Sequence, residues 1–319
     1  MLAVINITFP IFALIALGHV MTRRGWFVPQ EMSTLGHFTI NVALPALIFN
    51  AMVSRPLAEV VNPGYLLTYA LATVLTMALA GLALKIAGFR ARRCTVGMLG
   101  VCCSNSGYMG YPILMLAYPD LAGTVLTMQV VIENFLSIPL GLMAVESTTP
   151  RVRAEPLRLL VQILGGVLRR PMVQAVILGL IVNLSGIHLP QAVGHMVSIL
   201  AVSTSAVALF YIGGTLVGVP HERGDGLFVG LVVSVKLIAM PLIAFGLSAA
   251  LPHLGMPAVA AVLAVPLLIS AAMPTMGIFP ILAQDYGEGG VAAVTLLVAT
   301  VVSFFTISAL LALVHSPAL

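Results

Sequence analysis

Charged residues are scarce in this sequence. They make up 8% of the 319 residues, whereas 60% of the residues are hydrophobic. A soluble globular chain is roughly one-quarter charged, so water cannot be the solvent for most of this surface. The net charge of +4 comes from basic residues that flank apolar segments and form no separate basic domain. The composition therefore excludes an ordinary soluble enzyme, and we expect no nucleic-acid partner.

Cysteine is also rare, and its three residues, Cys94, Cys102 and Cys103, lie within one short region. Adjacent cysteines are poorly placed for an ordinary structural disulfide, and we interpret all three as small apolar packing residues. The sequence further lacks an H-E-x-x-H metal motif, a G-x-S-x-G elbow, a P-loop and paired aspartates within apolar segments. We therefore expect no enzymatic activity, no cofactor and no bound metal.

Long apolar runs recur along the chain, and they reach the ~20 residues that a helix needs to cross a bilayer. Barrel strands would instead appear as ~10-residue alternating segments. The first run lacks a basic leading segment and a cleavage site, so we interpret it as a permanent span. The sequence predicts an all-α integral membrane protein with about ten transmembrane helices, at residues 2–21, 35–53, 64–87, 95–117, 121–145, 171–187, 192–219, 227–251, 257–284 and 289–314.

The lysine and arginine residues predict the orientation of these spans. Twelve of the fourteen follow the first, third, fifth or seventh span, whereas Arg55 lies on the opposite side and Lys236 lies inside the eighth span. Short cytoplasmic loops carry an excess of Lys and Arg. Both termini are therefore expected outside the cytoplasm, with the basic loop 146–170 inside it.

That loop divides the chain into two five-span halves, residues 1–145 and 171–319. An odd number of spans in each half forces the second half to enter the membrane inverted, and inverted repeats are typical of transporters. Short matches at corresponding positions support the repeat. They pair Met109–Leu114 with Met276–Leu282, and Val42–Leu44 with Val207–Leu209.

Two predicted spans carry polar interruptions rich in proline or glycine, Ser104–Pro112 in the fourth and Met273–Pro280 in the ninth. Proline removes an amide donor and glycine tolerates a distorted backbone, so we expect both helices to unwind there. Unwound backbone in a membrane must be buried in protein or line a cavity. Paired interruptions in two halves indicate a substrate site at the membrane midplane, and the alternative is a pair of ordinary proline kinks.

Half-helix N-termini at such a site present free amides and positive dipole ends, which favour an anion such as a carboxylate. The substrate-binding residues that we predict come from both interruptions and from two other spans. They are Asn41, Asn105, Ser106, Gly107, Tyr108, Pro112, Glu133, Asn134, Pro274, Thr275, Met276 and Gly277.

Glu133 and Lys236 are the charged residues that we expect to couple transport to an ion. An intramembrane carboxyl group is costly to ionise, so Glu133 could carry a proton or pair with a cation. A carboxyl group that only bonds a neighbouring helix is the alternative. Lys236 lies deep in a predicted span and could compensate the charge of Glu133 or of the substrate, unless it snorkels to the interface.

The chain resembles the auxin efflux carrier family over essentially its whole length, within a wider superfamily that includes bile-acid/sodium symporters. The resemblance rests most on four segments. They are Asn41–Phe49, Asn105–Pro112, Lys236-Leu237 with Pro241, and Pro274–Tyr286.

This resemblance implies that broken helices four and nine cross in a mobile transport domain of spans three to five and eight to ten. Spans one, two, six and seven would form a scaffold, often dimeric, with elevator-like movement between the two. Asn105 matches the family's crossover asparagine and is expected to contact the substrate, unless its amide only satisfies the broken helix. Glu133 stands where plant relatives carry glutamine, and Lys236 could replace a sodium ion of the bile-acid branch. The short loop 146–170 is similar to that of bacterial members, for which malonate, malate or auxin-like acids are expected.

Together these features predict a secondary transporter of small organic anions in the plasma membrane of a bacterium, the inner membrane, working by elevator-type alternating access. Coupling to protons or uniport is favoured over sodium because no acidic cluster for a cation site is evident. The expected partners are the anion, the lipid bilayer and a second copy of the chain bound through scaffold helices. A sodium-coupled symporter and a membrane receptor or sensor for a carboxylate are the alternatives. A channel would more naturally show a selectivity ring.

Overall fold

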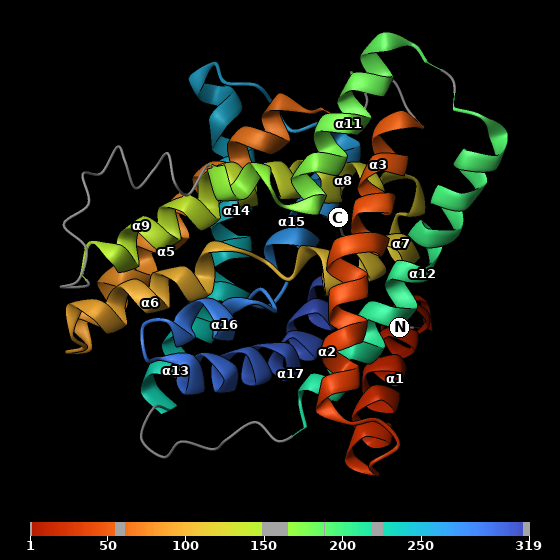
Figure 1. Cartoon of the computed structure of the whole chain (residues 1–319). Coiled ribbons are helices and arrows are strands. Elements are labelled where there is room, and N and C mark those ends of the chain that lie inside the picture. The colour runs from red at the N-terminus through yellow and green to blue at the C-terminus, as the bar shows by residue number, and fades with distance from the viewer. Residues whose placement is uncertain (1, 55–60, 149–164, 188, 218–225, 315–319) are drawn as a thin grey trace. The chain divides into compact units, whose positions relative to one another are not determined.

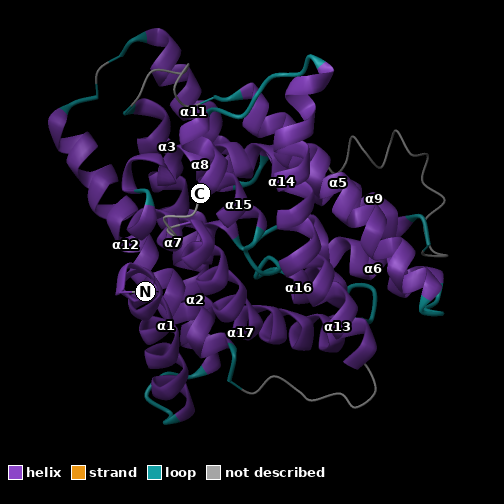
Figure 2. Cartoon of the chain, turned by 180° about the vertical axis from the view of Figure 1, so that it is seen from behind, coloured by secondary structure: helices purple, strands orange, loops and turns teal. Residues whose placement is uncertain are grey.

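The computed structural model describes residues 2–54, 61–148, 165–187, 189–217 and 226–314. These residues form an all-helical structure without a named strand, as Figure 2 shows. Helical segments occupy parts of every predicted span range. Most of the predicted basic loop, together with Arg55 and Arg223, lies outside the described residues.

Six helical stretches of the described residues are long and apolar enough to cross a membrane, and shorter apolar helices accompany them. The prediction of a multi-helical membrane protein is therefore confirmed, whereas the count of ten inverted spans stays a prediction. The six stretches are Gln30–Val53, Pro63–Ile86, Pro119–Glu146, Gln191–Thr215, Gly226–Leu254 and Gly289–Val314.

The chain forms two compact units. The first comprises Met1–Asn62, Ser106–Val131 and Leu168–Gly218. Its described helical segments are α1 (Leu2–Arg23), α2 (Pro29–Phe38), η1 (Thr39–Ala43), α3 (Leu44–Val53), η2 (Ser106–Gly110), α7 (Tyr111–Ala117), α8 (Pro119–Ile132), α11 (Pro171–Ser185) and α12 (Gln191–Thr215).

The second unit comprises Pro63–Asn105, Ile132–Val167 and Val219–Leu319. Its described helical segments are α5 (Pro63–Ile86), α6 (Ala91–Cys102), η3 (Glu133–Ser137), α9 (Ile138–Glu146), α13 (Gly226–Ser234), η4 (Val235–Ala239), α14 (Met240–Ala250), η5 (Leu251–Leu254), α15 (Ala261–Ala271), α16 (Phe279–Gln284) and α17 (Gly289–Val314).

In the first unit, α1 and α12 pack against each other so closely that their backbones are in contact (Figure 1). Glycine permits this approach. A Cβ atom on Gly18 would lie 2.1 Å from the carbonyl oxygen of Phe210, and one on Gly213 would lie 1.9 Å from that of Ile15. Lipid is as apolar as the helix surface, so the hydrophobic effect does not hold membrane helices together. Small residues let the helices associate through close van der Waals packing instead.

In the second unit, α6 packs against both α5 and α9 (Figure 2). These helices share a core of buried apolar side chains that includes Leu84 of α5, Leu99 of α6, Phe228 of α13 and Phe279 of α16. Phe228 also meets Phe89 edge to face, with ring centroids 5.7 Å apart. This core supports the helix ends that build the candidate site.

Four π-helical turns among the described residues, η1 to η4, each end two residues before a proline. A proline lacks an amide hydrogen and its ring clashes with the carbonyl four residues earlier. In η1, η3 and η4 the residue before the proline donates its N–H to the carbonyl five residues back, as Ile138 does to Glu133. The wider turn lets the helix continue through the proline, and Glu133 and Lys236 both lie in such turns.

Candidate functional site

Two interrupted helices meet within the second unit. Helix α6 ends at Cys102, and the break between α15 and α16 covers residues 272–278. The backbone N–H of Asn105 donates to the Pro274 carbonyl at 2.8 Å, and the backbone N–H of Met276 donates to the Cys103 carbonyl at 3.2 Å. Ser104 and Thr275 thereby form an antiparallel bridge. The two unwound segments satisfy each other's backbone groups, which a membrane interior requires.

The interruption in the fourth predicted span is shorter than expected. The sequence predicted unwinding over Ser104–Pro112, but the chain becomes helical again at Ser106, in η2. Pro112 and Pro280 lie in the first turns of α7 and α16. A proline costs no hydrogen bond in the first turn of a helix, so Pro280 begins a helix instead of unwinding it. Pro112 follows the π-helical turn η2, and the helix continues through it.

Ser104 connects several helices at this crossing. Its hydroxyl accepts hydrogen bonds from Tyr69 Oη at 2.9 Å and Lys236 Nζ at 2.8 Å, and donates to the Ser270 carbonyl at 3.0 Å. A hydroxyl has one donor and two acceptor positions, so all are used. Ser104 thereby links α5, η4 and α15 to the end of α6.

Glu133 and Lys236 meet at the same serine from different helices. Glu133 Oε1 accepts the backbone N–H of Ser104 at 3.3 Å, and Tyr69 Oη lies 3.5 Å from it. The Lys236 ammonium, fully buried, donates to the Ser104 hydroxyl and to Met240 Sδ at 2.8 Å. Lys236 and Glu133 are close enough to interact electrostatically. Buried charges need such partners. A snorkelling lysine would place its ammonium group at the membrane interface, so the full burial of Lys236 excludes that alternative.

Two polar side chains of the crossing have bonding capacity left. Thr275 is fully buried, and its hydroxyl has no hydrogen-bond partner among the described residues. Asn105 is 3% exposed, and its side-chain amide likewise bonds no other described residue. An unsatisfied buried polar group costs about 1–3 kcal/mol. A ligand with hydrogen-bonding oxygens would offset this cost.

The structure brings part of the predicted set together. Glu133 and Pro274–Met276 adjoin the crossing through the bonds described above, and Lys236 reaches it through Ser104. Gly277 lies in the same break and Asn134 is buried in η3. All of these residues, with Asn105, belong to the second unit.

The other predicted residues belong to the first unit. Asn41 is exposed, and its Nδ2 donates to the His37 carbonyl at 2.9 Å within its own helix. Tyr108 Oη donates to the Gly36 carbonyl at 3.2 Å. The remaining members of this group are Ser106, Gly107 and Pro112.

The predicted site did not include Tyr69, Ser104 or Ser270. Tyr69 and Ser270 lie in apolar helices that carry other hydroxyl residues, and their shared partner is distant in sequence. Ser104 stands beside Asn105 in a polar run, and that neighbourhood was the available signal.

A second polar cluster of this unit joins the ends of three helices. Arg93 Nε lies 3.2 Å from Glu288 Oε2, and Arg93 also stacks over the Phe228 ring at 5.8 Å. Tyr286 Oη donates to Glu146 at 2.7 Å. Burial, followed by this contact with Glu146, raises the pKa of Tyr286 well above its usual value. The cluster ties the start of α6 and the end of α9 to the segment before α17.

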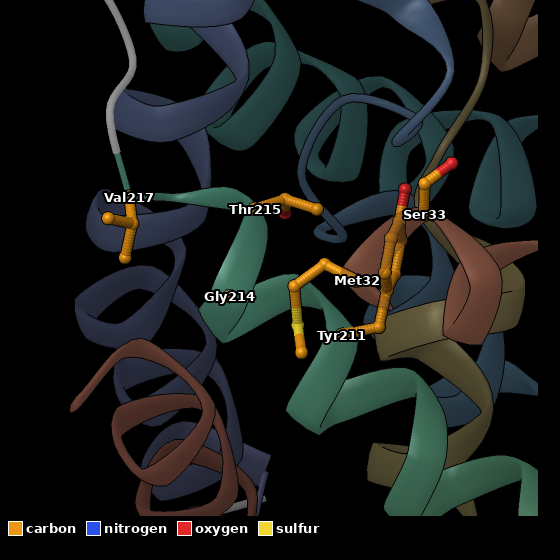
Figure 3. A pocket seen from close by; sticks show the side chains of 6 residues that line it. All are labelled: Met32, Ser33, Tyr211, Gly214, Thr215 and Val217. Atoms are coloured by element: carbon orange, nitrogen blue, oxygen red, sulfur yellow. The ribbon is translucent and has the colours of Figure 1, made fainter. Parts of the chain in front are cut away.

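The first unit contains a separate pocket of about 250 Å³, in which α12 supplies Tyr211 and Gly214 and α2 supplies Met32 (Figure 3). The Tyr211 ring packs against the Tyr108 ring, with ring centroids 5.2 Å apart. The lining has no charged residue and none of the predicted site residues. The lining residues are Met32, Ser33, Tyr211, Gly214, Thr215 and Val217.

The long apolar helices of the described residues define a multi-pass membrane protein, and its family makes it a transport protein and not an enzyme. Residues 3–311 match the family described as "Membrane transport protein", and the chain belongs to this family. The predicted membership of the auxin efflux carrier family is thereby confirmed.

Relatives agree with this assignment. The "Putative malonate transporter" of Rhizobium meliloti (strain 1021) is 26% identical over all of this chain and 98% of its own length. The "Uncharacterized transporter YfdV" of Escherichia coli (strain K12) is 25% identical over 73% of this chain and 74% of its own. The "Lysosomal cholesterol signaling protein" of Mus musculus is 26% identical over 73% of this chain but 28% of its own length.

Proposed function

We propose that this membrane transporter carries small organic anions, with dicarboxylates such as malonate and malate as the first substrates to test. The observation that carries the proposal is the paired break at Ser104 and Thr275, with Asn105 beside it. The name of the full-length Rhizobium relative supports malonate. Auxin-like monocarboxylates are a second substrate group that the same donors could bind.

The proposed anion contacts are the Asn105 amide and the Thr275 hydroxyl. Both can donate to a carboxylate, and hydrogen bonds to charged groups contribute about 1.5–3 kcal/mol each. Lys236 supplies positive charge from behind the crossing, through Ser104. In a medium of low dielectric constant this charge acts over a longer distance than in water.

We further propose that a proton accompanies the anion. Ionised Glu133 compensates Lys236 in the empty site, and protonation of Glu133 would leave the ammonium uncompensated. The negative charge of an entering carboxylate would then compensate the Lys236 ammonium in place of Glu133. Proton binding and anion binding therefore favour each other reciprocally. A fixed ammonium in this position also makes a sodium ion unnecessary, so uniport or proton coupling is favoured over sodium symport.

The proposed transport cycle is an elevator movement of spans three to five and eight to ten against a scaffold of spans one, two, six and seven. The composition of the two units supports it. The described parts of spans one, two, six and seven belong to the first unit, and those of spans three, eight, nine and ten belong to the second. Spans four and five contribute a part to each unit. Ten inverted spans, termini outside the cytoplasm of a bacterial inner membrane and a homodimer through the scaffold complete the proposal.

Uptake into proteoliposomes tests this function. Labelled malonate, malate and indole-3-acetate are offered to the wild type and to Asn105→Ala, with and without a pH gradient. Saturable uptake that the variant loses supports the anion carrier. Thr34→Ala is the control, because among the described residues that hydroxyl bonds only the Gln30 carbonyl of its own helix. Binding without flux would instead favour a carboxylate receptor.

A further inference from the structure

Two thiol groups lie side by side at the crossing and have no part in the proposed transport chemistry. Cys102 is the last residue of α6, and Cys103 begins the extended segment. Their sulfur atoms are 3.6 Å apart, and each residue is 1% exposed. Both are free cysteines.

The sulfur spacing decides what such a pair can bind. Two sulfurs held by one atom at the ~2.3 Å of a metal–thiolate bond lie about 3.3–3.8 Å apart, for bond angles from a right angle to tetrahedral. The observed 3.6 Å falls in this range. A disulfide suits the pair less, because adjacent Cα atoms are ~3.8 Å apart and ordinary disulfides need ~4.4–6.8 Å.

The surroundings decide which atom would be held. The described residues contain no group of three or more His, Cys, Asp or Glu side chains that could hold a metal ion, whereas a structural zinc site needs four ligands. A trivalent arsenic atom that carries one organic group needs only two thiolates. The product is uncharged, which suits a buried site where charge is costly.

We propose that Cys102 and Cys103 form a vicinal dithiol site that is modified by trivalent organoarsenic compounds. The arsenic arrives as an arylarsonous acid, the hydrated form of an arylarsine oxide. Its two As–OH bonds break and two As–S bonds form, while the two thiol protons leave with the hydroxides as two water molecules. Arsenic and sulfur keep their oxidation states, so no oxidant or reductant is required.

The modification acts on the crossing itself. The Cys103 carbonyl accepts the Met276 amide, and the Cys102 sulfur packs on α9, 3.1 Å from where a Cβ atom on Gly141 would lie. An added aryl group has no room beside these contacts. It therefore displaces the end of α6 or breaks the crossing, and it blocks transport; this last step rests on the proposed function.

The binding arm of the test uses the full chain in detergent with phenylarsine oxide and measures the intact mass. We expect one phenylarsenic adduct on the wild type and on Cys94→Ser, because Cys94 is outside the pair. We expect no stable adduct on Cys102→Ser or Cys103→Ser. An unmodified wild type, or an adduct that survives in both single variants, overturns the proposal.

The transport arm measures malonate uptake after the same treatment. Uptake should fall several-fold and return with 2,3-dimercaptopropanol, but not with a monothiol at equal thiol concentration, because a chelating dithiol competes for both As–S bonds. Cys94→Ser should lose uptake as the wild type does. Modified protein with undiminished uptake overturns the blocking step. An adduct on folded protein that transports none of the offered anions leaves the dithiol site supported and counts against the proposed function.

Discussion

Ser104 and Thr275 lie opposite each other in an antiparallel bridge, although they come from different halves of the sequence. They differ in one respect. The Ser104 hydroxyl uses all its bonding positions on protein groups, whereas the Thr275 hydroxyl uses none among the described residues. We infer that Ser104 holds the crossing together and that Thr275 is available to a substrate.

The first prediction concerns Ser104→Ala. This change removes the acceptor for both Tyr69 and Lys236, and each buried donor left unpaired costs about 1–3 kcal/mol. We expect a clearly lower thermal unfolding temperature in detergent. Ser303→Ala is the matched control, because within the described part of the chain that buried hydroxyl bonds only the Thr300 carbonyl of its own helix. If both changes lower the unfolding temperature equally, the contacts of Ser104 stabilise the protein no more than those of an ordinary buried serine.

The second prediction is that Glu133 and Lys236 depend on each other. Removal of one partner of a buried charge pair costs about 3–5 kcal/mol, whereas replacement of both by neutral residues is often tolerated. We expect Lys236→Met alone to be more destabilising than the double variant with Glu133→Gln. A double-mutant cycle of unfolding free energies should give a coupling of about 0.5–3 kcal/mol.

Additive effects in this cycle would mean that the two groups do not interact. A functional readout is independent of the cycle. Normal transport by Lys236→Ala at unchanged abundance would reject the role of Lys236 in coupling, whatever its effect on stability.

The sequence predicted the helices and both interruptions because these depend on local properties, namely the length of apolar runs and the positions of proline and glycine. It did not predict the Ser104 network. That network needs the register of helices whose partners are distant in sequence, such as Tyr69 with Ser104. The prolines of both interruptions were expected to lie in unwound backbone, but whether a proline begins a helix, as Pro280 does, or follows a π-helical turn within one, as Pro112 does, depends on how the helix packs.

The third prediction separates the two candidate coupling ions. If Glu133 carries the proton, malonate uptake should rise when the outside of the proteoliposomes is more acidic than the inside, because protons then flow inward with the anion. Uptake should not respond to a sodium gradient. Glu133→Gln, which mimics the protonated carboxyl group, should remove the pH response while binding is retained. Uptake measured under each gradient alone gives the answer, and dependence on sodium alone would reject proton coupling.

The fourth prediction concerns the contact of α1 with α12. A Cβ atom on Gly213 would lie 1.9 Å from the Ile15 carbonyl oxygen, which is backbone and cannot rotate away. Gly213→Ala should therefore force the two helices apart and lower the unfolding temperature, although alanine is the better helix former by about 1 kcal/mol. Gly194→Ala on the same helix is the matched control, since its Cβ would meet nothing within 4 Å. That variant should be neutral or slightly stabilising, so the difference between the two measures the helix contact without the change in propensity. Equal unfolding temperatures for the two variants would contradict the close approach of α1 and α12.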